Sequence, residues 1–359
     1  MELIQIVPRL PPAIDGLGDY AFYLAKQLRN DCGVDSHFIV GNPQWEGEQP
    51  IGFSVERVGE RSSASLIQSL QSFRGSASAV LLHYVGYGYA KRGCPFWMVR
   101  GLNEWKHERP GRRLVTIFHE LYAFGPPWSS SFWTSPFQKL LARRLAIISD
   151  QSVTPMKMYA RTLEKLCYRP ANRVIATPVF SNVGEPSQVS PLRERKNQIV
   201  VFGNAHQRAR VYAQHLEALI RTCETLKLEK IVDVGPPLDV KSRLPLPFIQ
   251  LGKQSALDLS TLLSNSQVGF LTYFDGYLAK SGIFAAYCAH GMLPVLPRRN
   301  SSDLDGIRNG CEYVVAGDIL HGPLETGQNI ADNAHKWYQR HSVAETAATL
   351  AAILKNSTS

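Results

Sequence analysis

The chain has 359 residues, of which 44% are hydrophobic and 19% charged, and its formal net charge is +9. This length exceeds one ordinary core and predicts two domains, and the apolar content argues against intrinsic disorder. The first residues lack a basic stretch followed by a long apolar run, and no segment reaches the roughly 18 apolar residues of a spanning helix, so we expect neither export nor a membrane span. Six scattered cysteines without metal-ligand spacing predict free thiols in a reducing cytoplasm.

Short apolar runs alternate with helical patterns through the first half of the chain. The predicted strands are 3–7, 36–40, 79–83, 114–118, 151–154 and 174–176. The predicted helices are 17–29, 64–73, 96–106, 136–146 and 156–166. Such alternation predicts a doubly wound parallel sheet.

One segment of this half combines basic and aromatic residues. Its members are Lys91, Arg92, Arg100, Lys106, Arg109, Arg112 and Arg113, interleaved with Tyr84, Tyr87, Tyr89, Phe96, Trp97 and Trp105. This composition suits an anionic membrane surface or a lipid-linked diphosphate acceptor, and a solvated basic helix face explains it equally well. It also suits single-stranded nucleic acid, but no nucleic-acid-binding signature supports that reading, so we expect no nucleic-acid partner. We expect a cytoplasmic location, with peripheral contact at the inner face of the membrane as an alternative.

The alternation is interrupted once and then restarts. Residues 177–197 are rich in Pro, Gly, Ser and charged residues, which predicts a linker over 181–197 between an N-terminal domain, 1–180, and a C-terminal domain, 198–330. In the second domain we expect strands at 199–202, 230–234, 248–251 and 268–271 and helices at 211–226, 256–264 and 283–290. The final segment, 331–359, is predicted as helix that packs back on the first domain. The fold class is therefore α/β, with two Rossmann-like doubly wound parallel-sheet domains facing a cleft.

Two glycine-containing turns stand where a strand leads into a helix. Asp15-Gly16-Leu17-Gly18-Asp19 follows the first strand, and Gly203-Asn204 follows the first strand of the second domain. Glycine allows close approach of the backbone, and a helix N-terminus offers free N–H groups to a phosphate. The alternative for the first turn is a plain strand-to-helix connection with Asp15 as N-cap.

These features and the segment 252–297 together resemble the GT-B glycosyltransferases, particularly the group that includes glycogen synthases and lipopolysaccharide sugar transferases. The segment contains a Leu-Gly turn, a helix, an apolar strand and a second helix that ends in Ala289-His290-Gly291 before Pro294. It departs from the family in one respect. The two acids that the family carries in this block fall on Leu278 and Ala286, and both positions are apolar. Asp275 is a candidate substitute, with a turn-capping role as the alternative.

The resemblance implies a site for the donor diphosphate in the second domain. Its residues would be Gly203, Asn204, Arg208 or Arg210, and Lys280-Ser281-Gly282 at a helix start. The positive charge would stabilise the departing diphosphate. In the first domain, the turn Gly16, Leu17, Gly18 and Asp19 would contact acceptor or phosphate.

Catalysis is assigned to His119 and Glu120, which follow a strand of the first domain. A histidine at a strand end can act as a base or bind a sugar hydroxyl, although a structural role is the alternative. His83, Asp275 and Tyr277 are further candidates for the cleft. We expect no cofactor and no metal, since no cluster of metal ligands is evident.

The predicted function is transfer of a sugar from a nucleoside diphosphate sugar to a hydroxyl of a glycan, a lipid-linked saccharide or a small molecule. An inactive scaffold that binds a sugar nucleotide or glycan as a partner subunit is the alternative, because the two acids are missing. A nucleotide-sugar epimerase of the same fold is a weaker alternative.

Overall fold

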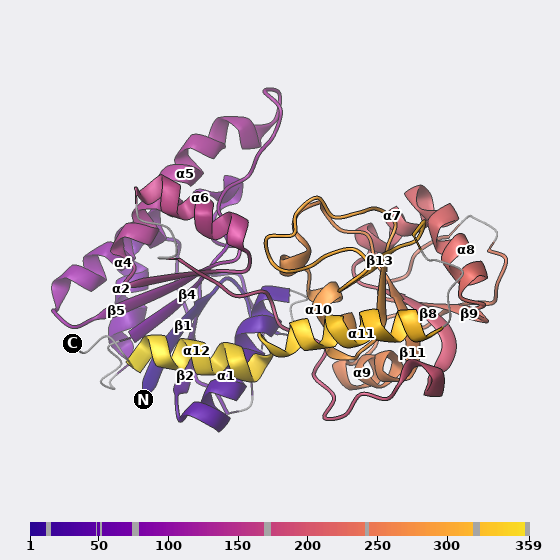
Figure 1. The fold of residues 1–359 in the computed structure, drawn as a ribbon. Helices are drawn as coiled ribbons and strands as arrows, with labels where there is room; N and C mark the ends of the chain where they lie inside the picture. The colour runs from indigo at the N-terminus through magenta and orange to yellow at the C-terminus, as the bar shows by residue number, and fades with distance from the viewer. Residues whose placement is uncertain are drawn as a thin grey trace. The chain divides into compact units, whose positions relative to one another are not determined.

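The computed structural model describes residues 1–11, 16–47, 49–50, 52–73, 79–168, 174–240, 244–318 and 324–355. It confirms an α/β fold with two parallel sheets, each covered by helices (Figure 1). The chain divides into two compact units. Unit 1 comprises Met1–Pro178 with Val343–Ser359, and unit 2 comprises Val179–Ser342.

Unit 1 contains a seven-stranded sheet in the order β3-β2-β1-β4-β5-β6-β7. Its strands are β1 Glu2–Val7, β2 Asp35–Val40, β3 Val55–Arg57, β4 Ala79–Tyr84, β5 Arg113–Phe118, β6 Gln151–Thr154 and β7 Ile175–Ala176. Every pairing between neighbours is parallel. The six strands predicted from apolar runs are confirmed, and the short β3 was missed because its residues are not buried.

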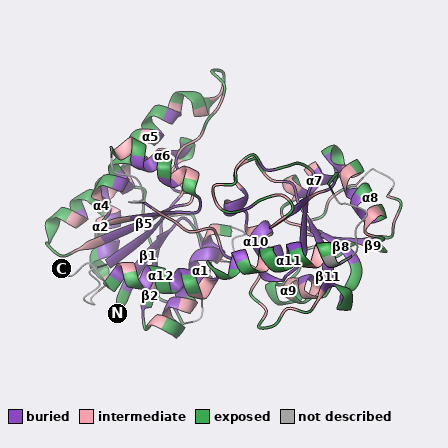
Figure 2. Ribbon diagram, in the orientation of Figure 1, coloured by how far each residue is buried: buried purple, intermediate pink, exposed green. Residues whose placement is uncertain are grey.

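The helices of unit 1 lie on both faces of its sheet, as a doubly wound fold requires (Figure 1). They are α1 Gly16–Cys32, α2 Ser63–Ser72, α3 Gly86–Tyr89, α4 Phe96–Glu108, α5 Ser130–Ile148, α6 Lys157–Cys167 and α12 Val343–Lys355. The C-terminal helix α12 packs on α1, while α2, α4, α5 and α6 are neighbours in sequence order. The strands β1, β2, β4, β5 and β6 between the two helix layers are largely buried (Figure 2).

Unit 2 contains a six-stranded parallel sheet in the order β10-β9-β8-β11-β12-β13. Its strands are β8 Lys196–Phe202, β9 Lys230–Val234, β10 Phe248–Gln250, β11 Ser266–Phe270, β12 Leu293–Leu296 and β13 Val314–Val315. Its α-helices are α7 Ala205–Gln214, α8 Leu216–Thr225, α9 Ala256–Ser264, α10 Gly282–Ala289 and α11 Leu324–Gln339. The α10 helix is buried throughout most of its length, which explains its all-apolar sequence.

Three helical predictions differ from the structure. The expected helix 211–226 is two helices, α7 and α8, that meet at His215. The C-terminal helices expected over 331–359 begin earlier, at Leu324, and residues 340–342 separate α11 in unit 2 from α12 in unit 1. The third, α5, begins six residues before Pro136, because the Ser129 hydroxyl accepts a hydrogen bond from the Phe132 amide and caps the helix. Residues 181–197, the predicted linker, lie within unit 2.

Candidate functional site

Each sheet reverses its strand order once, and the candidate residues gather at these two points. In unit 1 the reversal lies between β1 and β4, and in unit 2 between β8 and β11. Ligands of open α/β sheets bind beyond the carboxyl ends of the strands at such a reversal. His83 lies near the carboxyl end of β4, and Gly203 directly follows β8.

A chain of polar side chains crosses the reversal point of unit 1. His83 is fully buried, and its Nε2 lies 2.8 Å from Oε1 of Gln5 on β1. The Gln5 amide nitrogen donates to the Ser36 hydroxyl at 2.8 Å. On its other side, His83 Nδ1 lies 3.2 Å from Nε2 of the half-buried His119. The structure therefore brings two of the predicted site residues, His83 and His119, into direct contact.

These contacts determine which imidazole nitrogens carry protons. Burial lowers the pKa of His83 to about 3, so this ring is neutral at physiological pH. Its single N–H donates to Gln5, which leaves Nδ1 as an acceptor for an N–H on His119 Nε2. Neutral His119 then has its basic lone pair on Nδ1. A proton taken up at that atom would strengthen the bond from Nε2–H to His83.

The first turn of α1 lies beside these histidines. The Tyr20 ring packs edge-on against His119, with centroids 5.0 Å apart, and burial raises the Tyr20 pKa. Gly18 is buried, and a Cβ at this position would lie 2.6 Å from the Arg9 carbonyl oxygen. Gly18 thus permits close packing of α1 on the segment that follows β1. Gly16, Leu17 and Asp19 form the rest of this first turn, and Asp15, the predicted N-cap, lies outside the described residues.

The second predicted catalytic residue, Glu120, is half-buried and adjoins His119 on the segment that leaves β5. Tyr277 is also half-buried, and its backbone carbonyl accepts from the Lys280 amide at 2.9 Å. Glu120 therefore belongs to the unit 1 site, and Tyr277 to the loop before α10 in unit 2.

Two turns of unit 2 that the sequence assigned to a diphosphate lie against each other. Gly203 has a φ of +135°, and a Cβ there would lie 2.7 Å from Cδ1 of Ile283 in the first turn of α10. The Asn204 side chain caps α7 by accepting from the Gln207 amide at 2.9 Å, and the buried Ser281 hydroxyl caps α10 by accepting from the Phe284 amide at 3.2 Å. Two capped helix N-termini are thus brought together.

The start of α10 is open on one side. A Cβ added at Gly282, the first residue of α10, would meet no heavy atom within 4 Å. Lys280 precedes it in the 3-10 turn Leu278–Lys280 and is half-buried. Free N–H groups of a helix N-terminus and a nearby ammonium group are a favourable environment for an anion.

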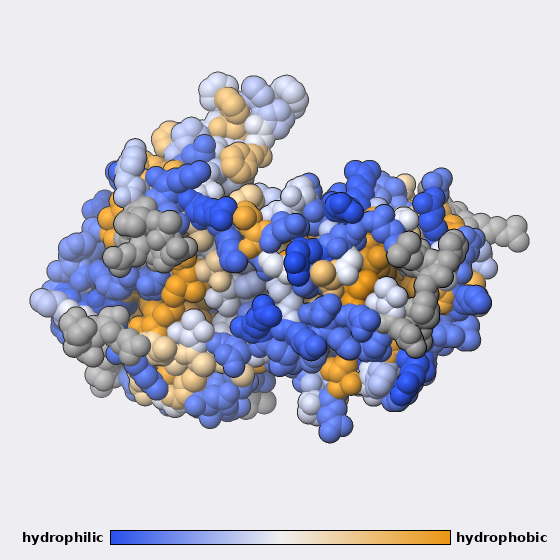
Figure 3. Space-filling view, viewed as in Figure 1, coloured by the Kyte–Doolittle hydropathy of each residue, from blue (hydrophilic) through white to orange (hydrophobic). Residues whose placement is uncertain are grey.

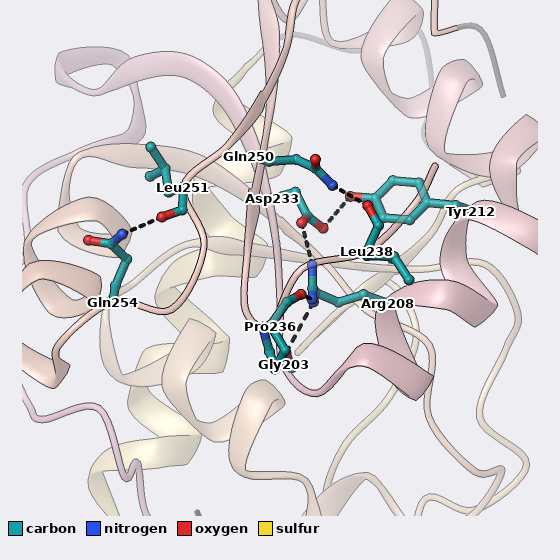
Figure 4. A network of polar contacts seen from close by, with 9 residues as sticks. All are labelled: Gly203, Arg208, Tyr212, Asp233, Pro236, Leu238, Gln250, Leu251 and Gln254. Carbon is teal, nitrogen blue, oxygen red and sulfur yellow. Dashed lines mark hydrogen bonds and ion pairs between the residues drawn. The ribbon is translucent and has the colours of Figure 1, made fainter. Parts of the chain in front are cut away.

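Arg208 has a buried role in the same region (Figure 4). Its side chain is 1% exposed and forms an ion pair with Asp233, whose second carboxylate oxygen accepts from the Tyr212 hydroxyl at 2.7 Å. The Arg208 guanidinium also donates to the carbonyl of Pro236, and to that of Gly203 at 3.1 Å. Arg208 therefore holds the Gly203 turn in place through its hydrogen bond to the Gly203 carbonyl.

Arg210, by contrast, lines a cavity of about 270 Å³ beyond β11 and β12. Other polar and charged residues of its wall are His215, Thr272, Asp275, Arg298, Arg299 and Asn300. The Arg210 guanidinium lies 5.4 Å from the centre of the Phe274 ring, which also lines the cavity. Burial lowers the pKa of His215, and the charges of Arg298 and Arg210 lower it further. The cavity thus combines three arginines with a single carboxylate.

Sequence reasoning missed Arg298 and Arg299. They follow Pro297, at the carboxyl end of β12, and the rule that ligands bind beyond such ends was the signal that could have found them.

The carboxylate of Asp275 already accepts a hydrogen bond from within the protein. The Ser301 amide donates to its carboxylate and holds the pKa of Asp275 below the ordinary value.

The basic and aromatic segment does not form one continuous charged face. Lys106 pairs with Asp150, Arg112 with Glu108 and Arg100 with Glu104. Tyr84, Tyr89 and Trp105 are buried, while Lys91, Arg92 and Phe96 are exposed. Within this segment, three aromatic side chains are therefore covered and three basic side chains are paired with acids, while others face solvent.

No family model and no curated protein matches the sequence. Solved structures match over nearly the whole chain. An alpha-glucosyltransferase in complex with UDP is 10% identical, with a TM-score of 0.62 and coverage of 98% of each chain. WaaG, a glycosyltransferase involved in lipopolysaccharide biosynthesis, is 12% identical, with a TM-score of 0.58 and coverage of 99% of this chain and 100% of that one. A putative UDP-N-acetylglucosamine 2-epimerase from Listeria monocytogenes is 13% identical, with a TM-score of 0.61 and coverage of 99% and 95%.

The chain has the GT-B fold. The glycosyltransferases among its structural neighbours include UDP complexes. At 10 to 13% identity the likeness establishes the fold and leaves the reaction to be argued from the site.

The two positions that carry acids in the resembling GT-B block are buried in this chain. Leu278 is 2% exposed and lines the arginine-rich cavity, and Ala286 is fully buried in α10. Neither position offers a carboxylate to a ligand. The cavity of unit 2 therefore has an apolar residue, Leu278, and three arginines in its wall.

Within the described ranges, no group of three or more His, Cys, Asp or Glu side chains has an arrangement suited to a metal ion. None of the helices in the described part of the chain combines the length and apolar character that crossing a bilayer requires.

Proposed function

We propose that the protein transfers a sugar from a nucleoside diphosphate sugar to a hydroxyl acceptor without a bound metal. Unit 2 would bind the donor, and unit 1 would supply the base and contact the acceptor. The observation that carries this proposal is the cavity that holds Arg210, Arg298 and Arg299, whose wall includes Leu278 in the turn that leads into the open start of α10. Arginine guanidinium groups and helix N-termini stabilise the charge that develops on a departing diphosphate.

Each part of the proposed reaction has a residue with suitable geometry. His119 would accept the proton of the acceptor hydroxyl at Nδ1, while its Nε2–H remains bonded to neutral His83. The diphosphate would lie near Gly282 and Lys280, with Arg210 and Arg298 as counter-charges. Arg208 would act indirectly by holding the Gly203 turn in place.

The acceptor class is open within this proposal. One neighbour of the same fold is an alpha-glucosyltransferase in complex with UDP-glucose and DNA, and another is involved in lipopolysaccharide biosynthesis. The fold alone therefore does not choose among glycan, lipid-linked saccharide and small molecule. The arginine-rich cavity concerns the donor only.

Binding of the donor can be tested by titration calorimetry with UDP and GDP. We expect Arg210→Ala and Arg298→Ala each to weaken nucleotide binding by roughly tenfold or more, as expected when a charge-assisted contact worth about 1.5–3 kcal/mol is lost. Arg221→Ala, on the exposed side of α8, is the matched control and should bind as the unaltered protein does. Absence of binding by the unaltered protein, or equal affinity in all variants, would refute the donor site.

An epimerase is the second candidate, because a putative 2-epimerase matches the chain as well as the transferases do. A transferase releases nucleoside diphosphate in proportion to glycosylated acceptor. An epimerase instead forms an isomeric sugar without an acceptor. Tight nucleotide binding without either product would favour the inactive scaffold, for which the apolar Leu278 and Ala286 are the structural argument.

A further inference from the structure

The helix α5 has apolar residues on two opposite faces. Its inward face, which includes Gln138, Leu141, Ala142 and Leu145, is buried in unit 1. The residues of its outward face recur at helical spacing and are all exposed. They are Phe132, Trp133, Pro136, Phe137, Leu140, Arg143, Arg144 and Ile147. An amphipathic surface helix would have polar residues there. Figure 2 shows the exposed residues along α5.

The amount of exposed apolar surface here is unusual for this chain. Of the fifteen large hydrophobic side chains that are exposed in the described residues, seven lie between Phe124 and Ile147. Trp128 is 86% exposed, Trp133 68% and Phe137 53%. Figure 3 shows hydrophobic surface on the arm that α5 forms with its preceding loop. Exposed apolar side chains gathered on one helix and its preceding loop indicate an interaction site.

The charge of the same stretch has one sign. Residues 121–149 contain no Asp or Glu, whereas Lys139, Arg143 and Arg144 are basic. Arg143 and Arg144 lie on the outward face, toward the C-terminal end of α5. The Lys139 ammonium group lies 4.9 Å from the centre of the Tyr122 ring, so the loop before α5 is tied to the helix by a cation–π contact. The partner of this surface must accept positive charge and apolar rings together.

A cavity of about 660 Å³ opens between α4 and α5 beside this face. Its wall is mainly apolar, with Phe96, Trp97, Val99, Leu141 and Ile147 among its members. Arg100 and Arg144 are its charged residues. Arg144 and Ile147 belong both to the cavity and to the outward face of α5, so the two features are continuous.

We propose that the outward face of α5, the loop 124–129 before it and the adjoining cavity bind the surface of an anionic lipid bilayer. Tryptophan and phenylalanine rings insert favourably at the boundary between headgroups and acyl chains. Arg143 and Arg144 would meet the negative surface potential of such a bilayer, which attracts basic residues near it. The cavity has room for part of an acyl chain, with arginines at its edge for a lipid phosphate.

The proposed surface overlaps the basic and aromatic segment only in the cavity wall, through Phe96, Trp97 and Arg100. In that segment Arg100, Lys106 and Arg112 are paired with Glu104, Asp150 and Glu108. On α5 no acid of the same stretch competes for the basic residues. Binding to vesicles requires no turnover, so a flotation experiment tests lipid binding independently of the proposed glycosyltransferase function.

The test is flotation of the full chain with vesicles of phosphatidylcholine alone or with one third phosphatidylglycerol. We expect binding to the anionic vesicles that weakens as salt is raised. Trp133→Gln with Phe137→Gln should reduce the bound fraction at least tenfold, and Arg143→Gln with Arg144→Gln should remove the preference for anionic lipid. Leu257→Gln is the matched control, because Leu257 is 77% exposed on α9 of unit 2.

Three results would overturn the proposal. One is equal recovery with neutral and anionic vesicles, or no recovery with either. Another is unchanged vesicle binding by the α5 variants. If these helix variants melt at a lower temperature, Phe124→Gln and Trp128→Gln in the preceding loop take their place in the test. The third is that the protein does not bind vesicles and this face has another partner. Light scattering would then show a dimer that the α5 substitutions dissociate, or a single-stranded oligonucleotide would bind at this face.

Discussion

His119 Nε2 lies 3.2 Å from Nδ1 of His83, and the two imidazole planes differ by only 19°. Because His83 donates its N–H to Gln5, it can only accept from His119. In the proposed reaction, Nδ1 of His119 would therefore be the nitrogen that takes up a proton. A strand-end histidine on β4 thus sets the orientation and the tautomer of the candidate base that follows β5.

The first prediction concerns this pair. His119→Ala should lower the rate of sugar transfer by roughly 10²–10⁴, the range for loss of a positioned base, with a smaller effect on KM. His83→Phe should lower kcat without removing donor binding, and His83→Gln, whose carbonyl can still accept the bond, should restore part of it. Nitrogen-15 NMR should show the Nε2–H tautomer of His119 in the unaltered protein and its loss in His83→Phe. An unchanged tautomer would show that His83 does not position His119.

A second prediction concerns the pH dependence of stability. His83 has a folded-state pKa of about 3 because it is buried, whereas its ordinary value is 6.5. The unfolded chain therefore binds a proton more readily, so the contribution of neutral His83 is complete above pH 6.5 and declines as the pH falls toward 3. For this one group, the free energy of unfolding should fall by about 2 kcal/mol between pH 7 and pH 5.

Urea unfolding at these two pH values measures the effect. The difference between pH 7 and pH 5 should be smaller in His83→Gln than in the unaltered protein. His290 is also buried, and its pKa is lowered to about 4. Because both proteins contain His290, it adds the same pH dependence of stability to each. Identical slopes in the two proteins would contradict the burial argument.

The order of strands and helices could be predicted from the sequence because apolar runs and helical patterns report burial directly. The strand β9 has the predicted bounds, 230–234, and α9 has the predicted bounds, 256–264. Failures occurred where burial was low, as at β3, or where a cap outweighed a proline, as at Ser129 and Pro136. Apolar periodicity alone reports neither a weakly buried edge strand nor a serine cap ahead of a proline.

The sequence indicated which residues follow strand ends, but not which of them make structural contacts. Arg208 and Arg210 are two positions apart, and nothing in the local sequence says that Asp233, 25 residues away, pairs with one of them. Likewise, the contact between His83 and His119 follows only from the pairing of β4 with β5. Long-range partners decide which charged residue is structural and which faces a ligand.

A third prediction separates these two arginines. Arg208→Ala leaves Asp233 buried without its cation, and breaking such a pair costs about 3–5 kcal/mol. The free energy of unfolding should fall by that amount, as measured by chemical denaturation. Arg210→Ala, which removes a half-buried side chain at the cavity, should change stability by less than about 1 kcal/mol while it weakens nucleotide binding. Equal loss of stability in both variants would contradict the structural assignment of Arg208.

The last prediction compares two glycines that each stand in the first turn of a helix. At Gly18 a methyl group would lie 2.6 Å from the Arg9 carbonyl oxygen, and backbone cannot move aside easily. Gly18→Ala should therefore lower stability by about 1–3 kcal/mol, the usual cost of overpacking. At Gly282 a methyl group would extend into open space. Gly282→Ala should leave the melting temperature unchanged or slightly higher, since alanine favours helix.

Gly282→Ala should nevertheless weaken UDP or GDP binding, because the methyl group would occupy the space through which a diphosphate approaches the N-terminus of α10. Titration calorimetry should show the affinity reduced roughly tenfold, equivalent to about 1.4 kcal/mol. The two readouts together are informative, because a structural glycine loses stability and a ligand-contacting glycine loses affinity. Unchanged affinity in a folded Gly282→Ala protein would place the diphosphate away from α10, and the three arginines of the cavity would then have to hold it without a helix N-terminus.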